Sequence, residues 1–177
     1  MLQPDFSFIY KYFTAEKNES LLFIIIGIIA IILAVIFFFF IKTNIALFKG
    51  AIIPLAVLGI IQLVAGYSVY ARSDKQSADV AYNIGLEPVA YANNKEIPRM
   101  ETVMKNFVIY RWVEIAMVIT GSVLFFSFKN NIDKQFWKGF GLTLAIMALL
   151  ALAADYFAEQ RGRIYLKGLQ QFTTTAV

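Results

Sequence analysis

One uninterrupted apolar run limits what this chain can fold into more than any other feature. The run extends from Leu21 to Ile41, and none of its 21 residues carries a polar side chain. Three further apolar segments cover about residues 50–70, 107–128 and 139–157. At ~1.5 Å per residue, each is long enough to cross most of a hydrocarbon core of ~30 Å. Peptide groups inside lipid must be hydrogen-bonded within the protein, so we expect all four segments to be helices.

The fold class predicted from these segments is an all-α integral membrane protein. We expect an up-down bundle of four transmembrane helices that forms a single domain over residues 1–177. The composition agrees, because 59% of the residues are hydrophobic and the mean hydropathy is +0.66. Values this high are not those of a soluble domain.

Missing residue types exclude several classes of function. The chain contains no cysteine and no histidine. Disulfides and thiol catalysis are therefore excluded, and the commonest ligands of zinc and haem are absent. The net charge of +4 comes from scattered residues, so we expect no nucleic-acid partner. We predict no cofactor, no metal and no catalytic residue.

Two polar segments flank the spans. Residues 5–17 place aromatic residues at helical spacing, which predicts an amphipathic helix lying in the membrane interface. A frayed terminus is the alternative. Residues 73–98 form the only long polar connection, and their tyrosine and aliphatic content predicts a partly ordered cap between the second and third transmembrane helices.

The third span carries charge where a membrane helix should not. Arg111 and Glu114 lie three residues apart on a face that also includes Met100, Met104, Phe107 and Gly121. We expect this face to pack inward and the two charged side chains to be within reach of each other. Charge at membrane depth costs several kcal/mol unless it is paired or hydrated, so such residues usually form a site or a structural ion pair.

The second and fourth spans carry stripes of small and polar residues. Gly59, Gln62 and Gly66 share one face of the second span, and small residues let membrane helices approach closely. On the fourth span, small residues lead into Asp155 and Glu159 on one face.

An up-down bundle brings these polar residues to the same membrane side. We predict a polar pocket about one to two turns inside that interface, roofed by the segment 73–98. The candidate ligand-binding residues are Tyr67, Tyr110, Tyr156, Gln62, Arg72, Arg111, Glu114, Asp155 and Glu159. The alternative for the charged residues is a purely structural lock, in which Arg111 and Glu114 pair with each other or with Asp155.

The two short turns resemble each other. The segments FFFFIKTNIALFKG and LFFSFKNNIDKQFWKG both end in a lysine and a glycine, Gly50 in the first and Gly139 in the second. This favours two helical hairpins related as a parallel repeat, although apolar helices also align by chance.

Three functions are compatible with these residues. The first is a non-catalytic membrane protein whose polar pocket binds a lipid, a small ligand or a partner subunit. The second is a small ion- or proton-coupled transporter that uses Glu114 and Asp155. The third is an intramembrane enzyme that acts on lipid, which would need a divalent metal.

The expected surroundings are a lipid bilayer, with a membrane partner or a second copy of the chain as further candidates. We expect a bacterial inner (plasma) membrane. The side that holds the termini carries 11 of the 16 basic residues, which favours cytoplasmic termini. The denser lysines of the short turns favour the opposite orientation.

Overall fold

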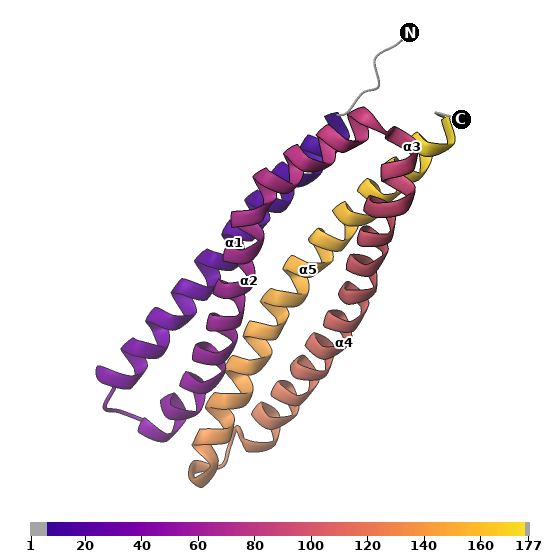
Figure 1. The fold of residues 1–177 in the computed structure, drawn as a ribbon. Helices are drawn as coiled ribbons and strands as arrows, with labels where there is room; N and C mark the ends of the chain where they lie inside the picture. Colours follow the sequence, from indigo (N-terminus) through magenta and orange to yellow (C-terminus); the bar gives the residue numbers. More distant parts are fainter. Residues whose placement is uncertain (1–6, 176–177) are drawn as a thin grey trace.

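The computed structural model describes residues 7–175 as an all-α bundle of four long helices (Figure 1). These are α1 (Ser7–Phe39), α2 (Ile45–Leu86), α4 (Ile97–Phe128) and α5 (Gln135–Thr175). All four are long and apolar enough to cross a membrane. The predicted all-α bundle with four membrane-crossing helices is therefore confirmed.

The helices run alternately up and down, and α2 and α5 occupy the centre. α1 packs on α2, α2 on α5, and α5 on α4 (Figure 1). At the first turn, Asn44 takes a left-handed conformation with a φ of 48°, which asparagine tolerates better than most residues. At the second turn, the side chain of Asn131 accepts a hydrogen bond of 2.9 Å from the backbone N–H of Asp133. These two short turns lie at the opposite end from Ser7 and Thr175.

The helices are much longer than a membrane requires. The 42 residues of α2 extend over ~63 Å at ~1.5 Å per residue, about twice the thickness of the hydrocarbon core. The apolar segments lie toward the short turns, so the remaining length stands outside the membrane at the other end. We call this second half the extramembrane bundle.

The first turns of α1 correct the prediction of a separate interfacial helix. Residues 7–17 are helical, but they continue directly into the membrane-crossing part of α1. Ile9, Tyr12 and Phe13 are buried against the other helices. Their apolar side therefore packs on protein and not on lipid. Residues 5 and 6 lie outside the described residues.

The connection between α2 and α4 is also more ordered than predicted. α2 continues to Leu86, and the short helix α3 (Pro88–Tyr91) and the π-helix η1 (Ala92–Glu96) lead into α4. Within the extension of α2, the buried residues recur at helical spacing, at Ser73, Ser77, Val80 and Ile84. The segment 73–98 is thus almost entirely helical and forms part of the extramembrane bundle, rather than the predicted partly ordered cap.

The extramembrane bundle has an aromatic core to which all four long helices contribute. The stacked rings of Tyr12 and Tyr165 lie at its centre, with 4.2 Å between centroids and 9° between planes. The buried residues of this core are Ile9, Tyr12, Phe13, Val80, Ile84, Met100, Tyr165 and Leu169. Burial of such side chains contributes roughly 1.5–3 kcal/mol each.

Inside the membrane, by contrast, small residues bring the helices together. A Cβ added to Gly27 would lie 2.7 Å from the carbonyl oxygen of Gly59, and one added to Gly121 would lie 2.6 Å from that of Gly141. Gly59, Gln62 and Gly66 are all buried, as their stripe predicted. Close approach of this kind is typical of membrane helices, because in lipid the hydrophobic effect does not drive helix association and close packing must do so.

The two hairpins touch through a reciprocal pair of glycines near the short turns. A Cβ added to Gly50 on α2 would collide with the backbone carbonyl of Phe136, and one added to Gly139 on α5 would collide with that of Leu47. Both positions therefore require glycine for the helices to stay this close.

Candidate functional site

Two arginines converge on one buried glutamate where α4 and α5 leave the membrane. Arg111 on α4 forms an ion pair with Glu159 on α5. The Nε and Nη2 atoms of Arg163 donate to Oε1 of Glu159, at 2.9 and 2.5 Å. The Glu159 side chain is 6% exposed, whereas those of Arg111 and Arg163 are 38% and 56% exposed. We call these three residues the arginine site.

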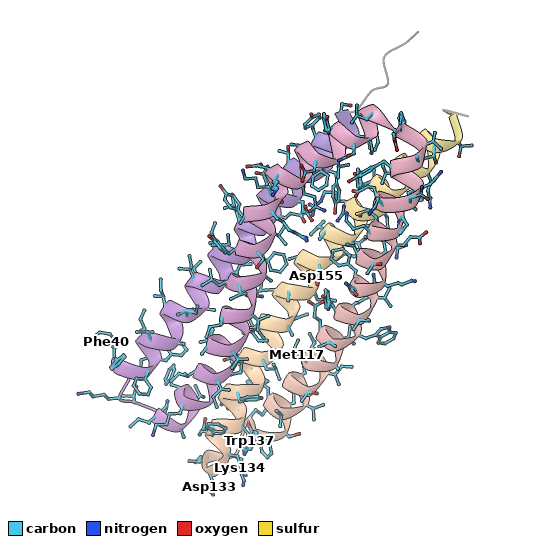
Figure 2. The ribbon with its side chains drawn as sticks, viewed as in Figure 1. Phe40, Met117, Asp133, Lys134, Trp137 and Asp155 are labelled. Atoms are coloured by element: carbon cyan, nitrogen blue, oxygen red, sulfur yellow. The ribbon has the colours of Figure 1, made fainter. Side chains whose placement is uncertain are left out.

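The position of the arginine site along α5 can be compared with the apolar segment of that helix. The fourth apolar segment covers about residues 139–157, so Asp155 lies in its last turn. Asp155 is correspondingly near the middle of the bundle (Figure 2). Glu159 and Arg163 lie one and two turns further along α5, beyond the end of that segment.

A pair of carboxyl groups lies just below the arginine site. Glu114 on α4 lies close to Asp155 on α5, near enough for the two carboxyl groups to interact. Glu114 is buried, and its Oε2 atom has no hydrogen-bond partner among residues 7–175. Glu114 faces inward, as predicted, whereas the Arg111 side chain is 38% exposed. Arg111, however, takes its carboxylate partner from α5 and not from Glu114 on its own helix.

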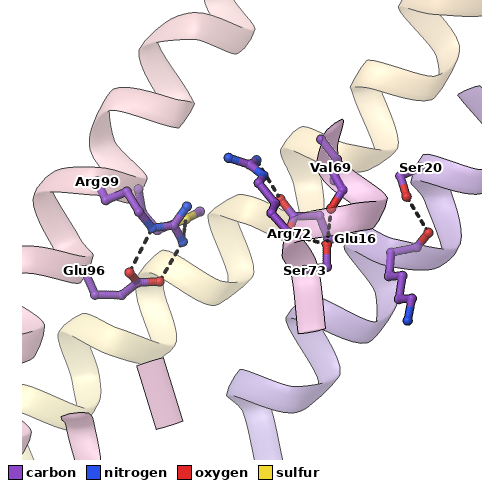
Figure 3. A network of polar contacts seen from close by, with 9 residues as sticks. Glu16, Ser20, Val69, Arg72, Ser73, Glu96 and Arg99 are labelled. Carbon is purple, nitrogen blue, oxygen red and sulfur yellow. Dashed lines mark hydrogen bonds and ion pairs between the residues drawn. The ribbon is translucent and has the colours of Figure 1, made fainter. Parts of the chain in front are cut away.

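A second set of ion pairs ties α1 to its neighbours at the base of the extramembrane bundle. Glu16 lies 3.6 Å from Arg72 and accepts a hydrogen bond of 3.4 Å from the Ser73 hydroxyl (Figure 3). Burial raises the pKa of the Glu16 carboxyl above its ordinary value, and the Arg72 guanidinium acts against this. Glu19 forms an ion pair with Arg161 on α5. Arg72, a candidate site residue, thus has its own carboxylate.

The most completely buried charge in the described chain is Glu96, which the sequence did not single out. Arg99 donates to both of its carboxylate oxygens, at 2.9 and 2.6 Å (Figure 3), and the Tyr165 hydroxyl donates at 2.9 Å. The Gln76 amide oxygen accepts from Arg99 at 3.1 and 3.2 Å once the amide is turned toward the guanidinium. Burial raises the pKa of the Tyr165 hydroxyl, and the Glu96 carboxylate raises it further.

Within residues 7–175, the other predicted site residues form no hydrogen bond with the arginine site. Tyr67, Tyr110 and Tyr156 are between 51% and 65% exposed, as expected of side chains that face lipid or the interface. Gln62 is buried in the membrane half of α2, and its Oε1 has no partner within the described residues.

Two hollows in the described surface lie elsewhere on the bundle. One of about 390 Å³ is lined by Lys167, Gln170, Gln171 and Thr174, and one of about 200 Å³ by Asn83, Leu86, Glu87 and Tyr91. The arginine site therefore lies outside both hollows, with the two arginines partly exposed on the α4–α5 surface and Glu159 buried beneath them.

The site and fold define an all-α bundle, able to cross a membrane four times, with charged side chains at one boundary. Comparisons with protein-family models, curated proteins and solved structures found no match to the chain. Among residues 7–175, no group of three or more acidic side chains is placed to hold a metal ion. The chemistry of this chain must therefore be argued from its own residues.

Proposed function

We propose that this is a non-catalytic integral membrane protein that binds an anionic ligand at one membrane interface. The arginine site carries the proposal, because two partly exposed guanidinium groups share a single carboxylate at headgroup depth. A lipid, a small ligand or an acidic segment of a partner subunit are the classes of ligand considered. Each would satisfy guanidinium donors that Glu159 does not use.

Native mass spectrometry of the purified protein tests this function. We expect the wild type to retain a small molecule or lipid, and Arg111→Ala to lose it. Glu114→Gln is the matched control, since Glu114 is one turn away on the same helix but makes no ion pair with the arginine site. A wild type that is bare in every detergent and nanodisc would contradict the proposal.

A second candidate function rests on the pair formed by the buried Glu114 and the half-buried Asp155. Two carboxyl groups can share a hydrogen bond only when one of them carries a proton. A small proton- or ion-coupled transporter could exchange that proton for its cargo at the boundary of the membrane.

Proton release in weakly buffered detergent solution distinguishes this candidate. A cationic substrate that displaces the proton would acidify the solution with the wild type and leave the pH unchanged with Glu114→Gln. Arg163→Gln should behave as the wild type, because the arginine site is not part of the carboxyl pair. If no cationic compound in a broad panel releases a proton from the wild type, the transporter function fails.

The surroundings proposed for the chain are a bacterial inner membrane with both termini in the cytoplasm. The distribution of 11 of 16 basic residues to the side of the termini supports this orientation. We also propose that the two hairpins descend from one repeated unit. The reciprocal glycine contact supports this, since the same number of residues separates Gly50 from Gly139 and Leu47 from Phe136.

A further inference from the structure

We propose that the arginine site binds the phosphate of an anionic phospholipid. The inference rests on the proposed function and names its ligand class. It is argued from charge, from free donors, and from the position of the site beside exposed aromatic side chains.

The arginine site differs in charge from every other ion pair that involves an arginine in residues 7–175. Arg72, Arg99 and Arg161 each pair with a separate carboxylate. Arg111 and Arg163 instead share Glu159, so the cluster keeps one net positive charge. These three residues together therefore attract an anion more strongly than a neutral ion pair does.

Hydrogen-bond donors remain free in the arginine site. A guanidinium has five N–H groups in a planar fork that matches phosphate oxygens. Arg111 reaches Glu159 through Nη2, and Arg163 uses Nε and Nη2. In the described part of the chain, no protein acceptor contacts the Nη1 amino group of either arginine. The Nη1 groups of both arginines are thus left for an acceptor outside the protein.

The surroundings of the arginine site match a lipid rather than a ligand dissolved in water. The fourth apolar segment ends at about residue 157, so Glu159 and Arg163 lie just beyond it, where phospholipid headgroups follow the hydrocarbon core. Trp112 follows Arg111 on α4 and is 67% exposed, and Tyr156 precedes Glu159 by one turn on α5 and is 55% exposed. Amphipathic aromatic rings at this level contact glycerol and the first methylenes of acyl chains.

Lipid binding can be measured by native mass spectrometry during titration with phosphatidylglycerol or phosphatidylcholine. We expect the wild type to prefer phosphatidylglycerol and Arg163→Gln to bind it roughly 10- to 100-fold more weakly, the usual effect of losing a charge-assisted hydrogen bond. Arg72→Gln is the control, because it removes an equally exposed interfacial arginine that has its own carboxylate partner. Equal losses in both variants would overturn the assignment in favour of nonspecific attraction.

Glu159→Gln tests the proposal through an expected increase, instead of a decrease, in the affinity for phosphatidylglycerol. Removing the competing carboxylate frees both guanidinium groups, so the folded variant should bind phosphatidylglycerol more tightly than the wild type. An arginine site with a purely structural role would lose stability without this gain, and unchanged or weaker binding by folded Glu159→Gln would count against the proposal.

Titration with inorganic phosphate tests whether the arginine site recognises the phosphate of a lipid or any phosphate ion in solution. We expect free phosphate to bind weakly, and to displace phosphatidylglycerol only at high concentration. Tight binding of inorganic phosphate without any preference for phosphatidylglycerol would overturn the lipid assignment and leave the proposed anion binding intact. A site that retains no anion of any kind would overturn both.

Discussion

Replacing Glu96 with alanine is expected to lower the free energy of unfolding by about 3–5 kcal/mol, because it leaves buried partners without their carboxylate. Glu96 is 2% exposed, and it accepts hydrogen bonds from Arg99 and from the Tyr165 hydroxyl. Without it, the buried Tyr165 hydroxyl and the largely buried Arg99 guanidinium lose their acceptor at the edge of the aromatic core. The measurement is chemical unfolding in detergent, followed by the fluorescence of Trp112 and Trp137.

Glu101→Ala is the matched control for Glu96→Ala. Glu101 is exposed on the first turns of α4, so its loss should change the free energy of unfolding by no more than about 0.5 kcal/mol. The double variant Glu96→Gln with Arg99→Gln removes both charges and should recover part of the loss. Should Glu96→Ala unfold at the same denaturant concentration as the wild type, the buried network does not stabilise the bundle.

Gly50→Ala is expected to destabilise the protein by about 1–3 kcal/mol, although alanine is the better helix former. The added Cβ meets the backbone carbonyl of Phe136, which cannot move without shifting α5. Gly139→Ala meets the carbonyl of Leu47 and should cost about as much. Because the two glycines lie at the same crossing, the double variant should lose less than the sum of the single losses.

Gly85→Ala, at another glycine of α2, is expected to raise the free energy of unfolding instead of lowering it. Nothing lies within 4 Å of a Cβ added there, so this variant should gain roughly 0.5–1 kcal/mol. Spin labels on cysteines introduced at exposed positions of α2 and α5 can follow the crossing directly, since the chain has no native cysteine. An unchanged label separation and unchanged stability in Gly50→Ala would show that the hairpins do not depend on this contact.

Periodicity along each helix was enough to predict much of this structure. The apolar runs predicted four spans, and helical spacing correctly placed Glu114 on the inward face of α4. The glycine stripe on α2 correctly indicated a close helix contact. These features depend only on positions within one helix, which spacing determines.

The partner of Arg111 could not be predicted in the same way. Spacing of three residues suggested Glu114, but the long arginine side chain reaches Glu159 on α5. Which residues meet across two helices depends on their offset, and that offset is set by the turn between α4 and α5 and by the Gly121 contact with Gly141. Neither is visible in the periodicity of a single helix.

The Glu96 network was missed for a related reason. Its members come from α2, η1, α4 and α5, and only the folded bundle brings them together. One signal was nevertheless present, because Ser73, Ser77, Val80 and Ile84 recur at helical spacing. That stripe predicts a continuous helix through the segment interpreted as a cap.

Because α2 and α5 are long continuous helices that touch near the short turns, they can be treated as two rods that cross near one end. Their backbones approach closely at the Gly50 and Gly139 crossing, which would be the pivot if the two helices rotated apart as rigid rods. Along α5, Glu159 lies ~30 Å from that pivot and Leu169 lies ~45 Å from it, at ~1.5 Å per residue. A force that spreads the ends of the rods by a given distance therefore opens the rods at the depth of Glu159 by about two thirds as much.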